Sequence, residues 1–214
     1  MPSVIAKNLT QMRRRITLAA KRAERDPAEI KLIAVSKTKP AAAVLEAIAA
    51  RCNSFGENKV QEADTKISEI GRDKAEWHLI GHLQKNKARR AVQLFDVIHS
   101  IDSPELAHRL ERICIEEGRP LLDVLVQVDL AGETTKSGIA ETELQLLVEV
   151  LKRCEHLRFI GLMVIPPFFD DPEDVRPFFQ RLRAIRDRLR EEGVFAEGEG
   201  ELSMGMTHDL EVAV

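Results

Sequence analysis

The sequence has 214 residues, of which 44% are hydrophobic and 31% are charged. Its 32 basic and 35 acidic residues give a formal net charge of −3, which excludes a global positive field for nucleic acid or anionic membrane. Three widely spaced cysteines (Cys52, Cys114 and Cys154) argue against a disulfide framework. Because the sequence has neither an apolar leader nor a run of 18 apolar residues, we expect a soluble cytoplasmic protein that does not enter a membrane.

The first elements follow from apolar periodicity. Residues 4–24 place apolar side chains at helical spacing, which predicts an amphipathic helix. The run KLIAVSK, residues 31–37, is short and rich in β-branched residues, which predicts a buried strand. Pro40 then begins AAAVLEAIAAR at a position where a first-turn proline is tolerated, so a second helix follows directly.

The same strand and helix pattern repeats to the end of the sequence. Six further apolar runs each precede a charged segment with helical periodicity; they are CNSFGEN, EWHLIGH, DVIHSID, LLDVLVQVDL, LRFIGLMVIPP and ELSMGMT. Alternating strands and helices predict parallel pairing with right-handed crossovers. Without a GxGxxG fingerprint, seven such units favour an α/β fold of the TIM (β/α)8 barrel type over an open doubly wound sheet. We expect residues 1–214 to form a single barrel domain, with the eighth strand missing from this sequence.

The carboxyl ends of barrel strands carry the chemistry, and the sharpest candidate there is Lys37. A lysine at the mouth of a barrel, with its stem along apolar surface, can lose its proton and attack a carbonyl carbon to make a Schiff base. The alternative is a salt-bridged or solvent-facing lysine.

The second candidate is LSMGMTHD, which ends the seventh strand and opens a helix. Thr207 is predicted to N-cap this helix, with Asp209 in its first turn. Together with Gly205 and backbone N–H groups, the hydroxyls of Ser203 and Thr207 would make a phosphate cradle, although a plain strand-to-helix turn is the alternative. A cradle that faces a reactive lysine predicts a phosphorylated aldehyde as the ligand.

Other polar groups are assigned structural roles. His78 and His82 have a spacing of four residues, but Gly81 and the strand context favour packing or polar positioning over metal ligation, so no metal site is predicted. The basic cluster of residues 85–90 has no interleaved aromatic side chains and is interpreted as a solvated helix face, so no nucleic-acid partner is predicted.

Seven strings, in this order and at these spacings, resemble the pyridoxal 5'-phosphate homeostasis proteins of the YggS/PROSC-like family, related to the N-terminal barrel of alanine racemase. The strings are AVSKTKP, FGENKVQEA, WHLIGHLQKNK, HSID, KSGI, GLMVIPP and LSMGMTHDLEVAV. The resemblance implies a type III pyridoxal phosphate barrel in which Lys37 carries the cofactor as an internal aldimine. It also implies that Asn58, Met163, Ser203, Met206 and Thr207 surround the ring and phosphate. The family usually has serine where this sequence has Thr207, and it continues into an eighth strand that this sequence lacks.

The sequence contains no tyrosine, so the tyrosine that alanine racemase uses for one face of its substrate is not supplied. We therefore expect a non-catalytic carrier, without catalytic residues, in vitamin B6 and amino-acid homeostasis. It would be a monomer, with pyridoxal phosphate-dependent apoenzymes as candidate recipients. Lys136 is a hypothetical second acceptor of the cofactor, although an exposed loop lysine is the alternative. Two other functions stay open: a pyridoxal phosphate-dependent racemase or decarboxylase, and a cofactor-free Schiff-base aldolase.

Overall fold

The structure is a computed structural model that describes residues 3–132, 137–196 and 198–214. Its strands are β1 (Ala34–Val35), β2 (Ser54–Glu57), β3 (Glu76–Leu79), β4 (Val97–Ile101), β5 (Leu122–Asp129), β6 (Ile139–Ala140), β7 (Leu157–Met163) and β8 (Glu201–Ser203). Its α-helices are α1 (Val4–Arg22), α2 (Ala41–Ala49), α3 (Val60–Ile70), α4 (Ala88–Leu94), α5 (Pro104–Glu117), α6 (Leu144–Leu151), α7 (Arg176–Glu191) and α8 (Leu210–Ala213). Short 3-10 turns such as Pro27–Glu29 connect some of them.

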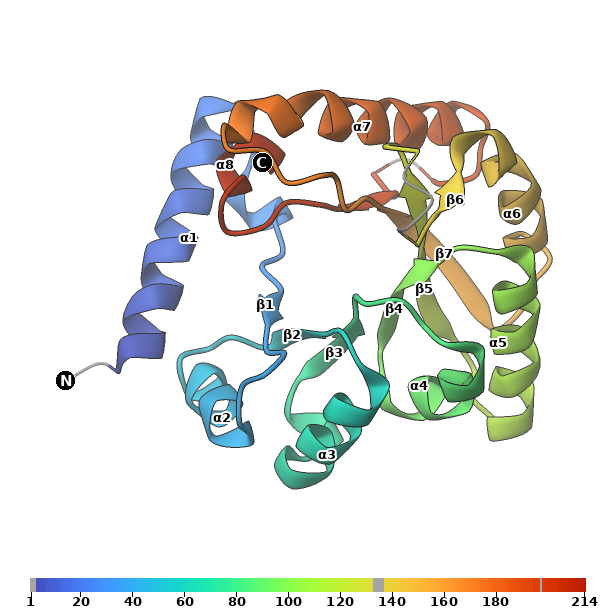
Figure 1. The fold of residues 1–214 in the computed structure, drawn as a ribbon, viewed down its shortest axis with the longest axis horizontal. Coiled ribbons are helices and arrows are strands. Elements are labelled where there is room, and N and C mark those ends of the chain that lie inside the picture. The colour runs from blue at the N-terminus through green and yellow to red at the C-terminus, as the bar shows by residue number, and fades with distance from the viewer. Residues whose placement is uncertain (1–2, 133–136, 197) are drawn as a thin grey trace.

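The strands form one curled parallel sheet in the order β1-β2-β3-β4-β5-β7-β8, while the short β6 pairs with β5 outside this path. Figure 1 shows the strands curling around one axis, with the helices outside them. Within the described part of the chain, β1 and β8 are the two ends of the strand order and do not pair with each other. The seven strands of this path therefore confirm the predicted barrel-type fold with an open seam between β8 and β1.

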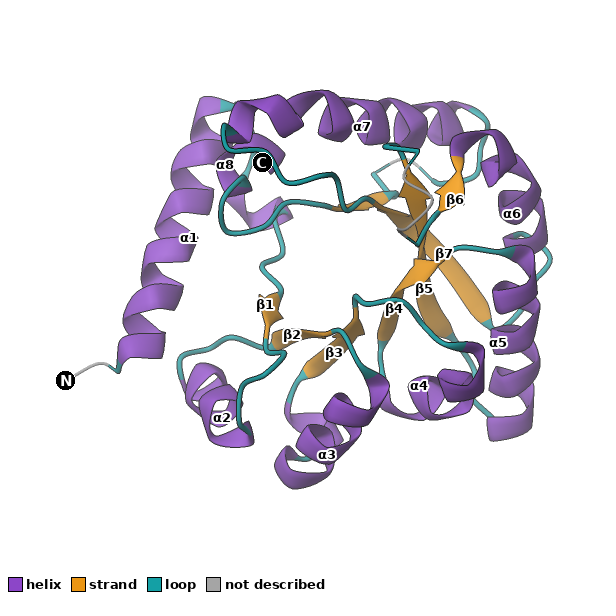
Figure 2. Ribbon diagram, viewed as in Figure 1, coloured by secondary structure: helices purple, strands orange, loops and turns teal. Residues whose placement is uncertain are grey.

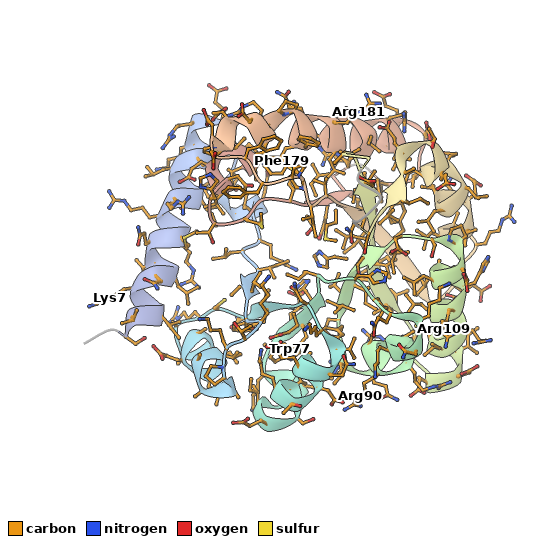
Figure 3. All side chains as sticks on the ribbon, viewed as in Figure 1. Lys7, Trp77, Arg90, Arg109, Phe179 and Arg181 are labelled. Atoms are coloured by element: carbon orange, nitrogen blue, oxygen red, sulfur yellow. The ribbon has the colours of Figure 1, made fainter. Side chains whose placement is uncertain are left out.

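The hydrophobic core lies between the strands and the surrounding helices. All five residues of β4 are buried, and Phe55 of β2 packs on Trp77 of β3 with ring centroids 5.7 Å apart. Figure 2 shows the helical layer outside the strands, and Figure 3 shows Arg90 and Arg181 on the outer surface of that layer. Strands that are buried on both faces, by helices outside and by packed side chains inside, need few exposed polar residues, which explains their nearly continuous apolar runs.

The chain ends where α8 packs against α1 and α7. Arg15 of α1 binds the Glu211 carboxylate with both Nε and Nη2 at 2.6 Å, and its Nη2 also donates to the Thr207 carbonyl at 2.9 Å. These bonds fix the segment after β8 to the first helix. They thereby connect the chain on the β8 side of the open seam to the helix that precedes β1.

Candidate functional site

Lys37 lies in the turn between β1 and α2. The parallel register pairs Val35 with Gly56, and the Ser36 N–H continues the ladder with a 3.0 Å bond to the Gly56 carbonyl. Lys37 follows directly and its side chain is exposed. The described contacts include none between its amine and Ser203 or Thr207, which a ligand would separate, so the predicted facing of lysine and cradle stays a prediction.

A buried ion pair holds the residue before Lys37. The Lys66 amine, on α3, lies 2.5 Å from Glu57 Oε1 and 2.7 Å from the Ser36 carbonyl oxygen. The Ser36 hydroxyl donates to the same Glu57 oxygen at 2.5 Å. Glu57 is fully buried and Lys66 is 5% exposed, so water cannot replace these bonds. Ser36 is thus fixed through both its carbonyl and its hydroxyl.

The residue after Lys37 is held as well. The backbone N–H of Thr38 donates to Glu62 Oε1 at 2.5 Å, and this bond lowers the pKa of the Glu62 carboxyl. Thr38 has a φ of +64°, in the left-handed region that a β-branched residue rarely adopts. Such backbone strain persists only where the surroundings impose it, and it is common at functional sites. We call Ser36, Glu57, Glu62 and Lys66 the lysine clamp, because they fix the backbone on both sides of Lys37.

On the other side of the seam, Ser203 ends β8 and points into the barrel interior. Met163, at the buried end of β7, pairs with it in the parallel register. Ser203 Oγ lies 2.9 Å from Nδ1 of His99, and His99 Nε2 lies 2.9 Å from Nδ1 of His78. His78 and His99 are each 2% exposed, so these side chains fill the interior between β3, β4 and β8.

The segment after β8 differs from the prediction in one respect. Thr207 does not cap a helix: it lies in a turn, exposed, and α8 begins only at Leu210, after Asp209. Asp209 is buried and accepts the Met206 N–H at 2.5 Å, so this carboxylate closes the turn that Thr207 was expected to close. Gly205 adopts φ +85°, where a Cβ would approach the Ala213 Cβ to 2.5 Å. The loop therefore needs glycine both for its conformation and for its packing on α8.

Asn58 is the remaining residue for which a cofactor contact is predicted. It follows β2 and is half-buried. A Cβ on Gly81 would lie 2.2 Å from the Asn58 carbonyl oxygen, so the two backbones touch and Gly81 admits no side chain. Asn58 and Gly81 also line an open depression of about 620 Å³ that His82 and Lys87 help to form. The predicted residues thus form two groups, one at the ends of β1 and β2 and one at the ends of β7 and β8, on either side of the seam.

Two further sequence predictions concern other polar groups. Lys136, the hypothetical second acceptor, lies outside the described residues. In the basic cluster, Arg90 pairs with Asp64, while Arg89 pairs with Glu116 and Glu117. Both arginine side chains are exposed on α4, in agreement with the interpretation as a solvated helix face. Among the described residues, no group of three or more His, Cys, Asp or Glu side chains could hold a metal ion.

The prediction missed two important residues. Lys66 occupies the buried face of α3 together with Ala63, Ile67 and Ile70, and a lysine within that apolar spacing was a signal of a buried partner. His99 lies in the fully buried strand β4, where an imidazole requires a hydrogen-bond partner. Neither partner can be identified until the register of the sheet is known.

The fold and the lysine after its first strand define the class. Residues 7–212 match the family model described as alanine racemase, N-terminal domain. The pyridoxal phosphate homeostasis protein of Pseudomonas aeruginosa is 43% identical over 212 residues, covering 99% of this chain and 89% of that protein. The Escherichia coli K12 protein of the same name is 42% identical over 215 residues, covering 98% and 89%. The chain belongs to the pyridoxal phosphate homeostasis protein family, as the sequence resemblance predicts.

Solved structures agree with this assignment. PipY of Synechococcus elongatus PCC7942, solved with pyridoxal phosphate bound, is 40% identical with a TM-score of 0.80, covering 94% of this chain and 92% of that one. Alanine racemase of Clostridium difficile 630 is 17% identical with a TM-score of 0.69, covering 92% and 50%, and therefore shows the shared fold alone. Among the described residues, no helix is long and apolar enough to cross a membrane.

Proposed function

We propose that this protein binds pyridoxal 5'-phosphate as a Schiff base on Lys37 and acts as a carrier in vitamin B6 and amino-acid homeostasis, without a turnover reaction of its own. The observation that carries the proposal is the lysine clamp. A surface lysine without a function needs no buried ion pair beneath it and no strained residue beside it. The names of the relatives and the ligand of the PipY structure support the choice of cofactor.

We assign the contacts with this cofactor to the chain's own residues as follows. Lys37 supplies the amine, and the clamp restricts where its Cα can lie. Asn58 follows β2, which pairs with β1, and Met163 ends β7, which pairs with β8, so one residue lies on each side of the seam. Ser203, Gly205, Met206 and Thr207 form the segment that would receive the polar groups of the cofactor. The bound aldehyde would supply reversible chemistry: the amine nitrogen bonds to the carbonyl carbon and water leaves, so that another amine can later displace Lys37.

A carrier needs fewer functional groups at its cofactor site than an enzyme does. An enzyme that uses this cofactor must also supply an acid or base for the substrate carbon. The relatives are named for homeostasis rather than for a reaction, which supports a carrier. The proposed setting is the cytoplasm, the proposed form is a monomer of one barrel domain, and apoenzymes that need the cofactor are the proposed recipients.

The test is an absorbance titration with pyridoxal phosphate. The wild-type protein should gain an imine band that borohydride removes, and Lys37→Ala should not gain it. Lys39→Ala is the matched control, because Lys39 is an exposed lysine of the same turn. The loaded protein should leave the enantiomer ratio and concentration of added amino acids unchanged. An unaltered band in Lys37→Ala, or steady conversion of an amino acid, would contradict the proposal.

A further inference from the structure

A chain of polar side chains crosses the barrel interior from the start of β3 to the end of β8. It begins at the Glu76 carboxylate, whose Oε2 lies 3.1 Å from His78 Nε2. It continues from His78 Nδ1 to His99 Nε2 over 2.9 Å, and from His99 Nδ1 to Ser203 Oγ over 2.9 Å. The two imidazole rings meet edge to face at 71°. The first contact is an ion-pair distance without hydrogen-bond geometry, and among the described atoms His78 Nε2 has no hydrogen-bond partner.

The protonation state of each member follows from its surroundings. Burial favours the neutral form of Glu76, but hydrogen bonds from Ser54 at 2.8 Å and Lys31 at 3.0 Å, with His78 nearby, lower the pKa of Glu76 to about 2. Burial lowers the pKa of His99 to about 3, and it also lowers the pKa of His78. Near neutral pH the chain therefore consists of one carboxylate and two neutral imidazoles.

The positions of the N–H protons on the two neutral imidazoles are restricted by the groups at the ends of the chain. A neutral imidazole carries one N–H and one lone pair, and a carboxylate can only accept. His78 must then direct its Nε2–H toward Glu76, which makes its Nδ1 an acceptor for His99 Nε2–H. His99 Nδ1 becomes an acceptor in turn, and among the described residues the donor within reach is the Ser203 hydroxyl. The opposite order would direct the lone pair of His78 Nε2 at the carboxylate, which is repulsive at 3.1 Å.

We propose that Glu76, His78 and His99 are positioning residues that keep the Ser203 hydroxyl proton in a hydrogen bond to His99 Nδ1. Ser203 Oγ can then only accept a hydrogen bond from a ligand. This rests on the proposed function and gives Ser203 another role than the one the sequence predicts. A phosphate dianion has no proton to donate, whereas the protonated ring nitrogen of pyridoxal phosphate has one. Ser203 accordingly receives a donor group of the cofactor, and the phosphate is left to the loop of residues 204–207.

We call Glu76, His78, His99 and Ser203 the relay. The charged groups around it are compatible with the proposed direction of its hydrogen bonds. Lys31, before β1, and Asp96, before β4, act on His78 in opposite directions. Lys31 also opposes protonation of His99, while Glu76 favours it. Glu201 of β8 and Asp123 of β5 lie in the same electrostatic environment as Glu76 and Lys31. The cation of Lys31 is closest to Glu76, so it stabilises the carboxylate that sets the direction of the relay.

The relay is tested in the cofactor-free protein by nitrogen-15 NMR of its histidine side chains. Both His78 and His99 should be neutral Nε2–H tautomers between about pH 6 and pH 8. Glu76→Gln replaces the carboxylate by an amide that can donate or accept, so both tautomers should become comparably populated at each ring. Ser54→Ala is the matched control: it removes a neighbour of the same carboxylate but leaves the acceptor in place, and the tautomers should not change.

Added ligands test the consequence for Ser203. Inorganic phosphate and pyridoxal phosphate should both leave the two tautomers unchanged, and Ser203→Ala should weaken pyridoxal phosphate binding about fivefold, as expected for one hydrogen bond. An Nδ1–H tautomer or a doubly protonated ring at His78 or His99, in the free protein or with either ligand, would overturn the proposal. If pyridoxal phosphate does not bind at all, the proposed function fails, while the tautomers of the free protein still decide whether the relay exists.

Discussion

Lys37 is held in position largely by side chains that lie 20 or more residues away in the sequence, namely Glu57, Glu62 and Lys66. The clamp reaches it from β2 and α3, and its central pair, Glu57 and Lys66, is almost fully buried. Burying two charges is unfavourable unless their geometry and further hydrogen bonds compensate. Here the Ser36 carbonyl and hydroxyl supply some of those bonds, while Glu57 Oε2 is buried without a hydrogen-bond partner among the described residues. Stability alone would be served as well by two apolar residues, so the pair is better explained by the turn that it fixes.

Removing one partner of this pair should affect both folding and cofactor capture. Lys66→Met leaves the Glu57 carboxylate buried without its cation, and the free energy of unfolding should fall by about 3 to 5 kcal/mol. The rate at which borohydride traps pyridoxal phosphate on the folded protein should fall as well, because the turn is no longer held. Arg158→Met, which removes the exposed pair with Asp123, is the control and should cost less than about 1 kcal/mol.

Urea denaturation and the trapping assay measure these two effects separately. If Lys66→Met unfolded at the same denaturant concentration as wild type and trapped the cofactor equally fast, the clamp would have no role in placing Lys37.

At the scale of elements, close contacts between neighbouring strands restrict which residues can stand beside the candidate site. Gly161 of β7 faces β8 so closely that a Cβ would lie 2.1 Å from the Glu201 carbonyl oxygen. The short β8 carries Ser203 two residues later, paired with Met163. A side chain at Gly161 must therefore displace the strand that ends at the candidate cofactor segment.

We expect Gly161→Ala to lower the melting temperature clearly and to disturb Ser203. Overpacking of this kind typically costs about 1 to 3 kcal/mol. In the same histidine NMR spectrum, the His99 signals should shift because β8 moves. Gly193→Ala is the control: Gly193 also has a positive φ, but its Cβ would meet nothing within 4 Å, so only backbone strain of roughly 1 kcal/mol is added. Unchanged His99 signals in Gly161→Ala would show that β8 tolerates the side chain.

The elements also show what a sequence can predict. The alternation of apolar runs and charged helices was sufficient for the seven strands and for Lys37 and Ser203 at strand ends, because these depend on local periodicity. The parallel arrangement followed from the rule for crossovers, and Asn58 and Met163 followed from the family resemblance. Thr207 was misplaced, because the start of the last helix depends on the buried Asp209 carboxylate and on Gly205 packing against Ala213. Lys66 and His99 were missed because their partners are distant in sequence.

For the whole molecule, the buried relay makes stability depend on pH. The pKa of His99 is about 3 in the folded protein, below its ordinary value of 6.5. Between these values the unfolded chain binds a proton that the folded protein does not bind. The free energy of unfolding is thus highest above pH 6.5 and falls as the pH decreases toward 3. His78, whose pKa is also lowered by burial, adds to this trend.

Wild-type protein should therefore lose on the order of 2 kcal/mol of unfolding free energy between about pH 7.5 and pH 5. His99→Gln, which cannot titrate, should lose less over the same range, whatever its stability at pH 7.5. The exposed residue His108 provides the control His108→Gln, which should keep the wild-type slope. Urea denaturation at a series of pH values measures all three slopes. Equal slopes for wild type and His99→Gln would mean that His99 is not buried in its neutral form.

The central claim is that Lys37 is the residue that takes up the cofactor. Its most direct test is the mass of the protein after incubation with pyridoxal phosphate and reduction with borohydride, followed by mapping of the modified peptide. We predict one added pyridoxyl phosphate group per chain, on the peptide that contains Lys37, and none when Lys37 is replaced by alanine. A modification spread over several surface lysines, or placed on another single lysine at equal yield, would contradict the claim.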